Sequence, residues 1–421
     1  MGGQQSYSTL LLCVPRIVLG MRPRWFGNST EETLLNEANY TYEAILSGRV
    51  DQSGMIATLA SWRSRVQIPL RPPENTVSSF YIIRCCLFCT GVFMVGLLDS
   101  LSVNGMTLRN RIVMPPMQSG RASFNGEVTD RLINFYVRRS DVLGLPIVEH
   151  AYVSALGKIG PKQLGIYSDS LLDGFEKLAR GIHAVGAPAV VQISHAGAVA
   201  NQKVIGAMPV GPSDRYKTRM LQESELDALA DDFALAAERA VCAGFDGVEL
   251  HGAHGYLLNQ FFTPLLNKRT DEFGGSLENR MRFPLMVVER VRQKLGGRLL
   301  LYRLGCDDLA PSGTHIEDAV LFAVKLQDAG VHVLDVSGGM CGSEPRQLCH
   351  VKGYFVPQAQ VIKRAVRVPV IGVGGVTEPE FADGLVRAGR VDLVAVGRAL
   401  WHDNAWAQKA VQALSGVVSC V

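Results

Sequence analysis

The chain has 421 residues, 47% of them hydrophobic, and its formal net charge at pH 7 is +3. This length leaves room for one large barrel domain with an appendage or for two ordinary domains, and the composition is typical of a soluble globular enzyme. No basic stripe with interleaved aromatic residues stands out, so we exclude a nucleic-acid partner. The nine cysteines form an odd, irregular set, which argues against a disulfide framework and favours a reducing, cytoplasmic location.

Residues 1–93 differ in character from the rest of the chain. Residues 61–73 are rich in Arg and Pro and offer little contiguous apolar surface to offset the entropy of ordering. An uncharged run at residues 85–98 is short for a membrane span, so we do not expect a membrane anchor. The group Cys85, Cys86 and Cys89 lacks a second pair of ligands, and we expect no metal site. We interpret residues 1–93 as a disordered or mis-assigned N-terminal extension and expect residues 94–421 to form the folded domain.

From Met94 onward, apolar runs of strand length recur along the chain. They lie at residues 112–114, 146–148, 189–192, 247–250, 299–303, 333–336, 368–373 and 393–396. Amphipathic helical segments lie between most of them; the clearest begins at Ser224, a candidate N-cap with Asp227 three residues later, and stops at Gly244. Continuous apolar strands alternating with helices are typical of parallel strands covered on both faces. We therefore predict an α/β fold, a closed (β/α)8 TIM barrel; a doubly wound open sheet is the alternative, but no Gly-x-Gly-x-x-Gly follows the first strand.

The last two predicted strands are each followed by a glycine-containing turn. Gly374-Gly375 follows the seventh strand, and Gly397-Arg398 follows the eighth. In such barrels the loops after strands seven and eight commonly bind a phosphate through backbone N–H groups, and an Arg adds a charge-assisted bond. The alternative is that these glycines only turn the chain tightly. The pairing of the two signals favours phosphate binding.

Polar side chains also lie at the ends of earlier strands. Gln192 ends the third strand and Arg303 the fifth, while Pro116, Met117 and Gln118 follow the first. A flavin ring needs such a set: an amide for its pyrimidine edge, a cation beside N1 and O2, and groups near N5 and O4. Taken singly, Gln192 is equally compatible with a satisfied core amide, and Arg303 with a structural ion pair. Their placement at the strand ends of one barrel favours a ligand site.

Two imidazoles and a phenol follow the fourth predicted strand, in the segment His251-Gly-Ala-His254-Gly-Tyr256. Barrels keep their chemistry at the carboxyl ends of the strands, and these groups are suited to hold and protonate a substrate carbonyl system. The alternative is a structural histidine pair with a phenol that only orients the substrate. The loop at residues 267–280 is dense in Gly, Asn, Asp and Arg, and we predict a scaffold whose charges pair with one another and with backbone groups.

Several segments, taken in order, resemble the Old Yellow Enzyme family, that is, the NADH:flavin oxidoreductase / NADH oxidase family, over residues 97–412. The motifs are Leu108-Arg-Asn-Arg-Ile-Val-Met-Pro-Pro-Met117, Gln192-Ile-Ser-His195-Ala-Gly197, His251-x-x-His254-Gly-Tyr256, the 267–280 loop and Val396-Gly-Arg-Ala399. The resemblance implies bound FMN, with its ring held by Pro116, Met117, Gln192 and Arg303 and its phosphate by Gly374, Gly375, Gly397 and Arg398. It also implies that His251 and His254 anchor a substrate carbonyl and that Tyr256 donates a proton.

The activity that the resemblance implies is a ping-pong reduction of the activated C=C bond of α,β-unsaturated carbonyl compounds. NADPH or NADH reduces FMN and leaves; the enone then receives a hydride at its β-carbon and a proton from Tyr256 or water at its α-carbon. Two alternatives stay open: a 2,4-dienoyl-CoA or steroid-type reductase lacking its iron–sulfur and nucleotide-binding domains, and a flavin-binding barrel whose catalysis has decayed. The implied partner is a small enone-type molecule, and a homo-oligomer is compatible with the sequence.

The sequence departs from the family pattern in places. Gln118 stands where some branches have Cys or Thr, and we expect it to donate to flavin O4 and to alter the flavin potential. Ala198 follows the Gln-x-x-His-Ala-Gly motif where Arg is usual, so one interaction near the pocket is missing. His150, next to Glu149 at the end of the second strand, is a candidate to face the flavin. Residues 199–212 are expected to roof the pocket.

Overall fold

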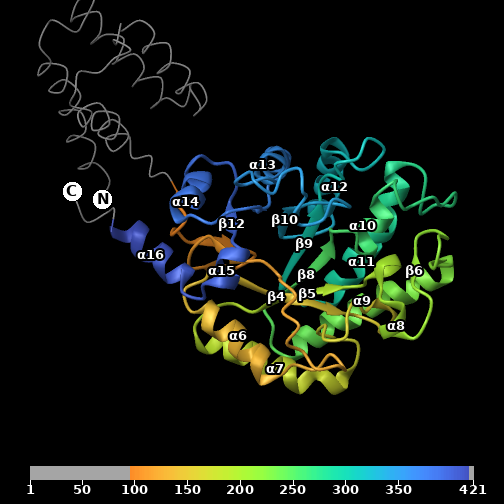
Figure 1. The fold of residues 1–421 in the computed structure, drawn as a ribbon, viewed down its shortest axis with the longest axis horizontal. Helices are drawn as coiled ribbons and strands as arrows, with labels where there is room; N and C mark the ends of the chain where they lie inside the picture. Colours follow the sequence, from red (N-terminus) through yellow and green to blue (C-terminus); the bar gives the residue numbers. More distant parts are fainter. Residues whose placement is uncertain (1–94, 417–421) are drawn as a thin grey trace, which may run out of the picture. The chain divides into compact units, whose positions relative to one another are not determined.

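The computed structural model of the chain describes residues 95–416, which form a closed barrel of eight parallel strands (Figure 1). In chain order the strands are β3 (Ile112–Met114), β4 (Leu145–Tyr152), β5 (Val190–Ser194), β8 (Gly247–Gly252), β9 (Leu299–Gly305), β10 (Val333–Ser337), β11 (Val370–Gly372) and β12 (Leu393–Ala395). Each strand pairs with the next, and β12 closes the ring on β3. Each predicted strand overlaps one of these elements, so the (β/α)8 prediction is confirmed and the open-sheet alternative is wrong.

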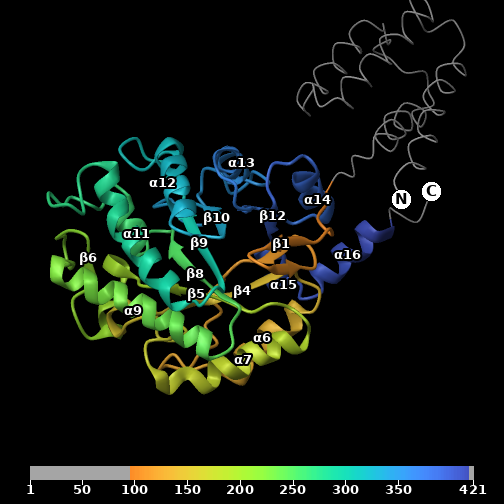
Figure 2. The ribbon, with the colours of Figure 1, turned by 180° about the vertical axis from the view of Figure 1, so that it is seen from behind.

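A helix follows each barrel strand and packs on the outside of the barrel (Figures 1 and 2). These outer helices are α6 (Asp130–Ser140), α7 (Leu172–Ala184), α9 (Glu223–Cys242), α11 (Leu277–Lys294), α12 (Ile316–Asp328), α13 (Val356–Ala365), α14 (Pro379–Arg387) and α16 (Trp406–Gly416). Three short helices lie in the loops: α8 (Gln202–Ile205), α10 (Leu257–Phe262) and α15 (Arg398–His402). The loops also contain the 3-10 turns η2 (Ala155–Gly157), η3 (Asp169–Leu171) and η4 (Gly197–Val199). Two further strand pairs are β1 (Leu101–Val103) with β2 (Met106–Leu108) and β6 (Val210–Gly211) with β7 (Arg219–Met220). Because helices cover the outer face, the strands are apolar on both faces.

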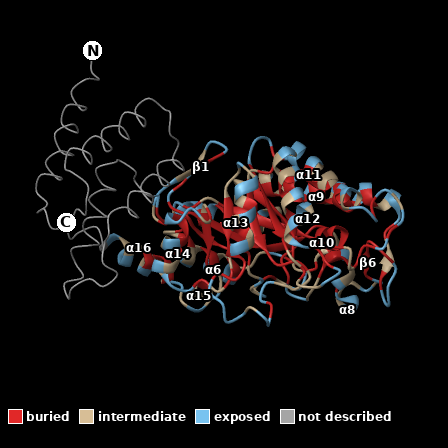
Figure 3. Ribbon diagram, turned by 90° about the horizontal axis from the view of Figure 1, so that it is seen from above, coloured by how far each residue is buried: buried red, intermediate tan, exposed pale blue. Residues whose placement is uncertain are grey.

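Two apolar layers pack the barrel, and Figure 3 shows the buried residues running through its centre. Val113 and Leu301 belong to the layer that fills the barrel interior, whereas the alternate residue Leu300 packs toward the helices. Val103 and Leu108 of the β1–β2 hairpin join the interior layer next to the amino-terminal ends of the strands. An apolar plug therefore closes that end, and the polar groups gather at the carboxyl ends.

The start of α9 differs from its prediction. The N-cap is Gln222 rather than Ser224, and the capping box uses Glu225 rather than Asp227: the Glu225 carboxylate accepts a hydrogen bond of 2.8 Å from the Gln222 backbone N–H. A Glu side chain reaches the N-cap backbone more easily than the shorter Asp, which explains the shift. The helix stops as predicted, because Gly244 follows it with φ +86°, a conformation that favours glycine.

Some expectations lie partly or wholly outside the described residues. The interpretation of residues 1–93, including the cysteine group at residues 85–89, is among them. Within residues 95–416, Cys242, Cys306, Cys341 and Cys349 are free thiols, and no group of three or more His, Cys, Asp or Glu side chains is arranged to hold a metal ion. In the same range, no helix combines the length and the apolar character needed to cross a membrane.

Candidate active site

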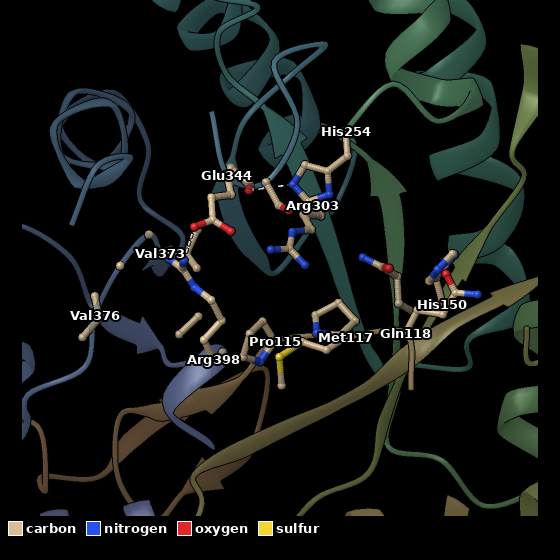
Figure 4. Close-up of a pocket in the computed structure, with 18 of the residues that line it drawn as sticks. Pro115, Met117, Gln118, His150, His254, Arg303, Glu344, Val373, Val376 and Arg398 are labelled. Atoms are coloured by element: carbon tan, nitrogen blue, oxygen red, sulfur yellow. Dashed lines mark hydrogen bonds and ion pairs between the residues drawn. The ribbon is translucent and has the colours of Figure 1, made fainter. Parts of the chain in front are cut away.

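A cavity of about 340 Å³ lies at the carboxyl ends of the barrel strands (Figure 4). Every residue predicted for the site lines it: Pro116, Met117, Gln118, His150, Gln192, His251, His254, Tyr256, Arg303, Gly374, Gly375, Gly397 and Arg398. Parallel closure explains this convergence, because the carboxyl ends of all the strands meet at one rim of the barrel.

His150 reaches the cavity because β4 is irregular. The pairing register between β4 and β5 shifts between Val148 and Ala151, as expected at a β-bulge. Val148 packs toward the helices, so strict alternation would place Glu149 inside the barrel and His150 outside it. The bulge reverses this order: His150 lines the cavity, while the Glu149 carboxylate lies near Tyr136 of α6, whose hydroxyl accepts a 2.6 Å hydrogen bond from the Glu149 backbone N–H.

His150, His251, His254 and Tyr256 form a compact ring cluster. His251 stacks on Tyr256 with ring centroids 4.4 Å apart, His150 lies edge-on to Tyr256 at 5.1 Å, and His254 lies edge-on to His251 at 5.2 Å. Nε2 of His254 lies 2.8 Å from Oγ of Ser337, at the end of β10. His254 has φ +56°, a strained conformation for a bulky residue, and such strain is typical of functional sites.

Burial keeps the groups of this cluster neutral. Desolvation lowers the pKa of His251 and of His254 well below the usual value, and Arg303 and the neighbouring imidazoles lower it further. Burial, followed by the charge of Arg303, lowers the pKa of His150 to about 4, and burial raises the pKa of Tyr256 to about 12. At neutral pH each imidazole therefore carries one N–H group, and the phenol keeps its proton.

A buried polar layer forms the base of the cavity. Arg303 forms an ion pair with Asp335, with Nε 3.3 Å from Oδ2, and Gln192 donates a hydrogen bond of 2.8 Å from Nε2 to Oε1 of Glu249. Burial raises the pKa of Glu249 and of Asp335, whereas the charge of Arg303 lowers both. Within residues 95–416, the side-chain oxygen of Gln192 and the Nη atoms of Arg303 have no hydrogen-bond partner. The side-chain oxygen of Gln192 is therefore available as a hydrogen-bond acceptor for a ligand in the cavity, and the guanidinium of Arg303 as a cation.

Glycine turns and Arg398 form the other end of the cavity. Gly374 and Gly375 have φ +118° and +62°, which only glycine adopts without strain. A Cβ atom on Gly374 would lie 2.6 Å from the ring of Tyr354, so the turn packs directly on that ring. The backbone N–H groups of Gly375, Gly397 and Arg398 donate no hydrogen bond to any of residues 95–416. These donors and the guanidinium suit an anion.

Arg398 is paired with a carboxylate at this end of the cavity. Its Nη1 donates to Oε1 of Glu344, which lies in the loop between β10 and α13 (Figure 4). The two side chains are 48% and 46% exposed, so solvent screens the pair. Tyr354 stabilises the same loop, because its hydroxyl donates a 2.7 Å hydrogen bond to the carbonyl of Ser343. The guanidinium that the sequence assigns to a phosphate therefore already contacts an acid.

The donor and acceptor set fits the flavin mononucleotide that the sequence resemblance implies. One end of the cavity has free backbone N–H groups and Arg398 for a phosphate, and the base has Gln192 and Arg303 for a pyrimidine edge. Nδ1 of His251 is buried without a hydrogen-bond partner among the described residues, whereas Nε of Arg303 faces the Asp335 carboxylate. Unsatisfied buried polar atoms cost free energy, which favours a polar ligand beside them.

The loop at residues 267–280 is a scaffold, as predicted. Arg269 pairs with Asp271 at 2.5 Å and donates to the backbone carbonyls of Pro212 and Leu221. Arg280 likewise donates to backbone carbonyls within and beside the loop. None of these charges lines the cavity, so the loop supports the site from outside.

The sequence missed several lining residues. Ser337 ends β10 one position beyond the predicted strand, and its place at a strand end was a signal that could have identified it. Glu344 and Tyr354 lie in a long loop with no periodic pattern, so no signal pointed to them. Residues 199–212, expected to roof the pocket, are not among the residues that line it, and that expectation is wrong.

Known proteins share this sequence pattern. The profile of the NADH:flavin oxidoreductase / NADH oxidase family matches residues 97–416. The chain is 41% identical over 321 residues to the NADH oxidase of Thermoanaerobacter brockii. The aligned region covers 73% of this chain and 49% of that protein. It is 35% identical over 328 residues to the NADPH dehydrogenase of Geobacillus sp. (strain WCH70), which covers 77% of this chain and 96% of that protein. The chain thus spans about half the length of the first relative and nearly all of the second.

Solved structures share the barrel. The Old Yellow Enzyme homologue from Zymomonas mobilis has a TM-score of 0.67 at 27% identity, covering 76% of this chain and 93% of that chain. 2-Naphthoyl-CoA reductase in complex with 2-naphthoyl-CoA has a TM-score of 0.72 at 26% identity, covering 76% of this chain and 52% of that chain. The chain therefore belongs to the NADH:flavin oxidoreductase / NADH oxidase family of enzymes, as its resemblance to Old Yellow Enzyme predicted.

Proposed function

We propose that the protein is an FMN-dependent NAD(P)H oxidoreductase that reduces the activated C=C bond of small α,β-unsaturated carbonyl compounds. The observation that carries this proposal is the cluster of His251, His254 and Tyr256 against one wall of the cavity. Two neutral imidazoles can bind a carbonyl oxygen by hydrogen bonding, and a neighbouring phenol can supply a proton. This is the chemistry that reduction of an enone requires from a protein.

The residues at the base and at the glycine end of the cavity would hold FMN. Gly374, Gly375, Gly397 and Arg398 would bind its phosphate, Gln192 and Arg303 its pyrimidine edge, and Pro116, Met117, Gln118 and His150 the remaining ring positions. When bound, FMN supplies the hydride carrier between NADPH or NADH and the substrate. Asp335 holds Arg303 in place, so that a positive charge stays fixed at the base of the cavity.

The histidines and the tyrosine would act on the substrate. His251 and His254 would donate hydrogen bonds to the carbonyl oxygen and stabilise the negative charge that develops there in the transition state. Oη of Tyr256 would give its proton to the α-carbon. Because burial raises the pKa of Tyr256 to about 12, the phenol keeps that proton at neutral pH until a carbanionic carbon takes it. Water would then restore the proton on Oη.

A second candidate is a dienoyl-CoA or steroid-type reductase whose natural form uses further domains. The likeness to 2-naphthoyl-CoA reductase, which spans 52% of that chain, favours this candidate. Such an enzyme would prefer long acyl or polycyclic substrates and would work poorly with NADPH or NADH supplied directly. A flavin-binding barrel without catalysis is a third candidate, and the retention of His251, His254 and Tyr256 together argues against it.

The absorption spectrum of the purified protein tests the proposal first. Visible flavin bands that bleach under anaerobic NADPH and return with cyclohexenone would support the ene-reductase. A flavin that bleaches with NADPH but returns only with an acyl-CoA or polycyclic enone would favour the second candidate. A colourless protein that does not take up FMN would contradict the cofactor assignment and leave only the barrel.

A further inference from the structure

Among residues 95–416, hydrogen-bond partners are found for only one ring nitrogen of His150, Nδ1. Nδ1 lies 3.0 Å from Nε2 of Gln163 and 3.1 Å from Oγ of Ser194. Nε2 of His150 has no hydrogen-bond partner among residues 95–416, and the residue lines the cavity (Figure 4). One edge of the ring is therefore anchored, and the other edge is available to a ligand.

The orientation of the Gln163 amide is fixed by two backbone groups. Its Oε1 accepts a hydrogen bond of 2.7 Å from the backbone N–H of Ile159, and its Nε2 lies 3.3 Å from the backbone carbonyl of His150. A backbone N–H only donates and a carbonyl only accepts, so exchanging the two ends of the amide would break both contacts. Gln163 is fully buried, so bulk solvent does not reach these groups. The amide N–H₂ group must therefore face Nδ1 of His150.

This orientation sets the tautomer of His150. A neutral imidazole carries one hydrogen, and the nitrogen that accepts a hydrogen bond cannot carry it. Since Nδ1 accepts from Gln163, the hydrogen resides on Nε2. Burial and the charge of Arg303 lower the pKa of His150 to about 4, so the doubly protonated ring is absent at neutral pH. The Ser194 hydroxyl adapts, because its hydrogen rotates toward the nitrogen lone pair.

We propose that Gln163 is a positioning residue that locks His150 in the Nε2–H tautomer and thereby gives the cavity a fixed hydrogen-bond donor. His150 lies edge-on to Tyr256 at 5.1 Å and 5.8 Å from the centroid of His251, so the donor is part of the proposed catalytic cluster. The opposite tautomer would present a lone pair at the same place and repel an acceptor. This inference rests on the proposed function for the identity of the acceptor, which is a carbonyl-type oxygen or a ring nitrogen.

The tautomer itself can be measured without any ligand. In the full chain with ¹⁵N-labelled histidine, ring ¹⁵N shifts distinguish Nδ1–H from Nε2–H, and a His150→Gln variant assigns the signal. We expect Nε2–H in the parent protein at pH 8. An Nδ1–H signal there would overturn the proposal. A protein that lacks FMN gives the same reading, so failure of this inference is distinguishable from failure of the proposed function.

Two substitutions test whether Gln163 sets the tautomer. Gln163→Glu replaces the donor with a carboxylate, which accepts from Nδ1–H, so we expect the His150 tautomer to reverse at pH 8. Gln163→Met removes both polar ends at similar volume, and we expect a mixture of the two tautomers. Gln260→Glu is the matched control: Gln260 is equally buried, but the hydrogen bonds of its side chain within residues 95–416 go to backbone groups of Ala196, Ala198 and Gly255. An unchanged tautomer in both Gln163 variants would overturn the proposal.

The acceptor is identified by adding ligands to the parent protein. A shift of the His150 Nε2–H signal on addition of FMN identifies the flavin, and a further shift when cyclohexenone is added to the oxidised, FMN-loaded protein identifies the substrate. In Gln163→Glu we expect the affinity for that ligand to fall about two- to tenfold, the loss expected for one hydrogen bond. No shift with either ligand would overturn the donor role of His150.

Discussion

Arg398 donates a hydrogen bond to Glu344 at the glycine end of the cavity, so the guanidinium proposed to hold the flavin phosphate already faces a carboxylate. Both side chains are about half exposed, and an exposed pair of this kind contributes little to stability. A phosphate must nevertheless compete with Glu344 for the same guanidinium, and the two anions repel each other. Glu344 is therefore expected to weaken phosphate binding at this end of the cavity.

Glu344→Gln removes the competing charge. We expect FMN to bind about two- to fivefold more tightly, the range that corresponds to a surface ion pair. Fluorescence titration of the apoprotein measures this, with riboflavin as the matched ligand because it lacks the phosphate. Glu378→Gln is the matched variant: Glu378 pairs with Lys352 at similar exposure and does not line the cavity. An equal gain with riboflavin, or in Glu378→Gln, would show that Glu344 does not compete for the phosphate.

Arg303→Met leaves the buried carboxylate of Asp335 without its ion-pair partner. The Arg303 and Asp335 side chains are 6% and 0% exposed, and breaking such a pair from one side costs about 3–5 kcal/mol. Without the cation the pKa of Asp335 rises further above its unfolded value, so the destabilisation should be larger at pH 8 than at pH 5. Urea denaturation at the two pH values measures this. Adding Asp335→Asn should recover most of the loss, and failure to recover it would contradict the pairing as its cause.

The raised pKa of Glu149 leads us to predict that the protein loses stability as the pH rises, which is opposite to the usual effect of a carboxyl group. Burial, the largest cause, raises its pKa to about 7, whereas a Glu in the unfolded chain titrates near ~4.3. Between these values the folded protein binds the proton more readily than the unfolded chain. The stability that Glu149 contributes is therefore fully present below the lower value and is lost as the pH rises through about 7.

The side chain in Glu149→Gln is a neutral amide at every pH, so this variant should not show the loss of stability that Glu149 causes as the pH rises. The difference in unfolding free energy between the variant and the parent should change by about 3 kcal/mol between pH 4 and pH 8, at roughly 1.4 kcal/mol per pKa unit. The buried histidines contribute the opposite slope to both proteins, so they cancel in the difference. A difference that stays flat with pH would mean that Glu149 titrates normally in the folded protein.

The location of the site could be predicted from the sequence because strand ends carry a clear signal. Apolar runs of strand length located each barrel strand, and polar residues just beyond those runs, such as Gln192 and Arg303, converge on one rim. Because the strands are parallel and the barrel is closed, their carboxyl ends meet at one rim whatever the sequences of the connecting segments. Local turn chemistry at Gly374 and Gly375 identified the opposite end of the cavity in the same way.

What the sequence could not reveal depends on contacts between distant segments. The β4 bulge that turns His150 inward leaves no trace in a strand that is apolar on both faces. Glu344 reaches Arg398 from a loop without periodicity, 54 residues away in the chain. At the start of α9, both Ser224 and Gln222 are compatible with a capping box, and only the folded helix decides between them.

Tyr256→Phe separates the two half-reactions of the proposed enzyme. In the proposed mechanism the phenol donates a proton only to the substrate, so reduction by NADPH should keep its parent rate, while oxidation by cyclohexenone should slow by about 100-fold or more. Anaerobic stopped-flow measures each half-reaction separately. The phenyl ring retains the stacking on His251, so the cavity should keep its shape. An equal loss in both half-reactions would indicate a structural role for Tyr256.

His254→Ala tests the carbonyl anchor. Removing one fixed donor to a developing negative charge lowers kcat by about 100-fold or more, so cyclohexenone reduction should fall by that factor while FMN remains bound. Ser337→Ala removes only the hydroxyl that lies 2.8 Å from Nε2 of His254, and it should have a smaller effect in the same direction. If His254→Ala still reduces cyclohexenone at the parent rate, the donor role of His254 is wrong. In that case His251, whose Nδ1 has no partner among the described residues, would be the remaining imidazole able to bind the carbonyl next to Tyr256.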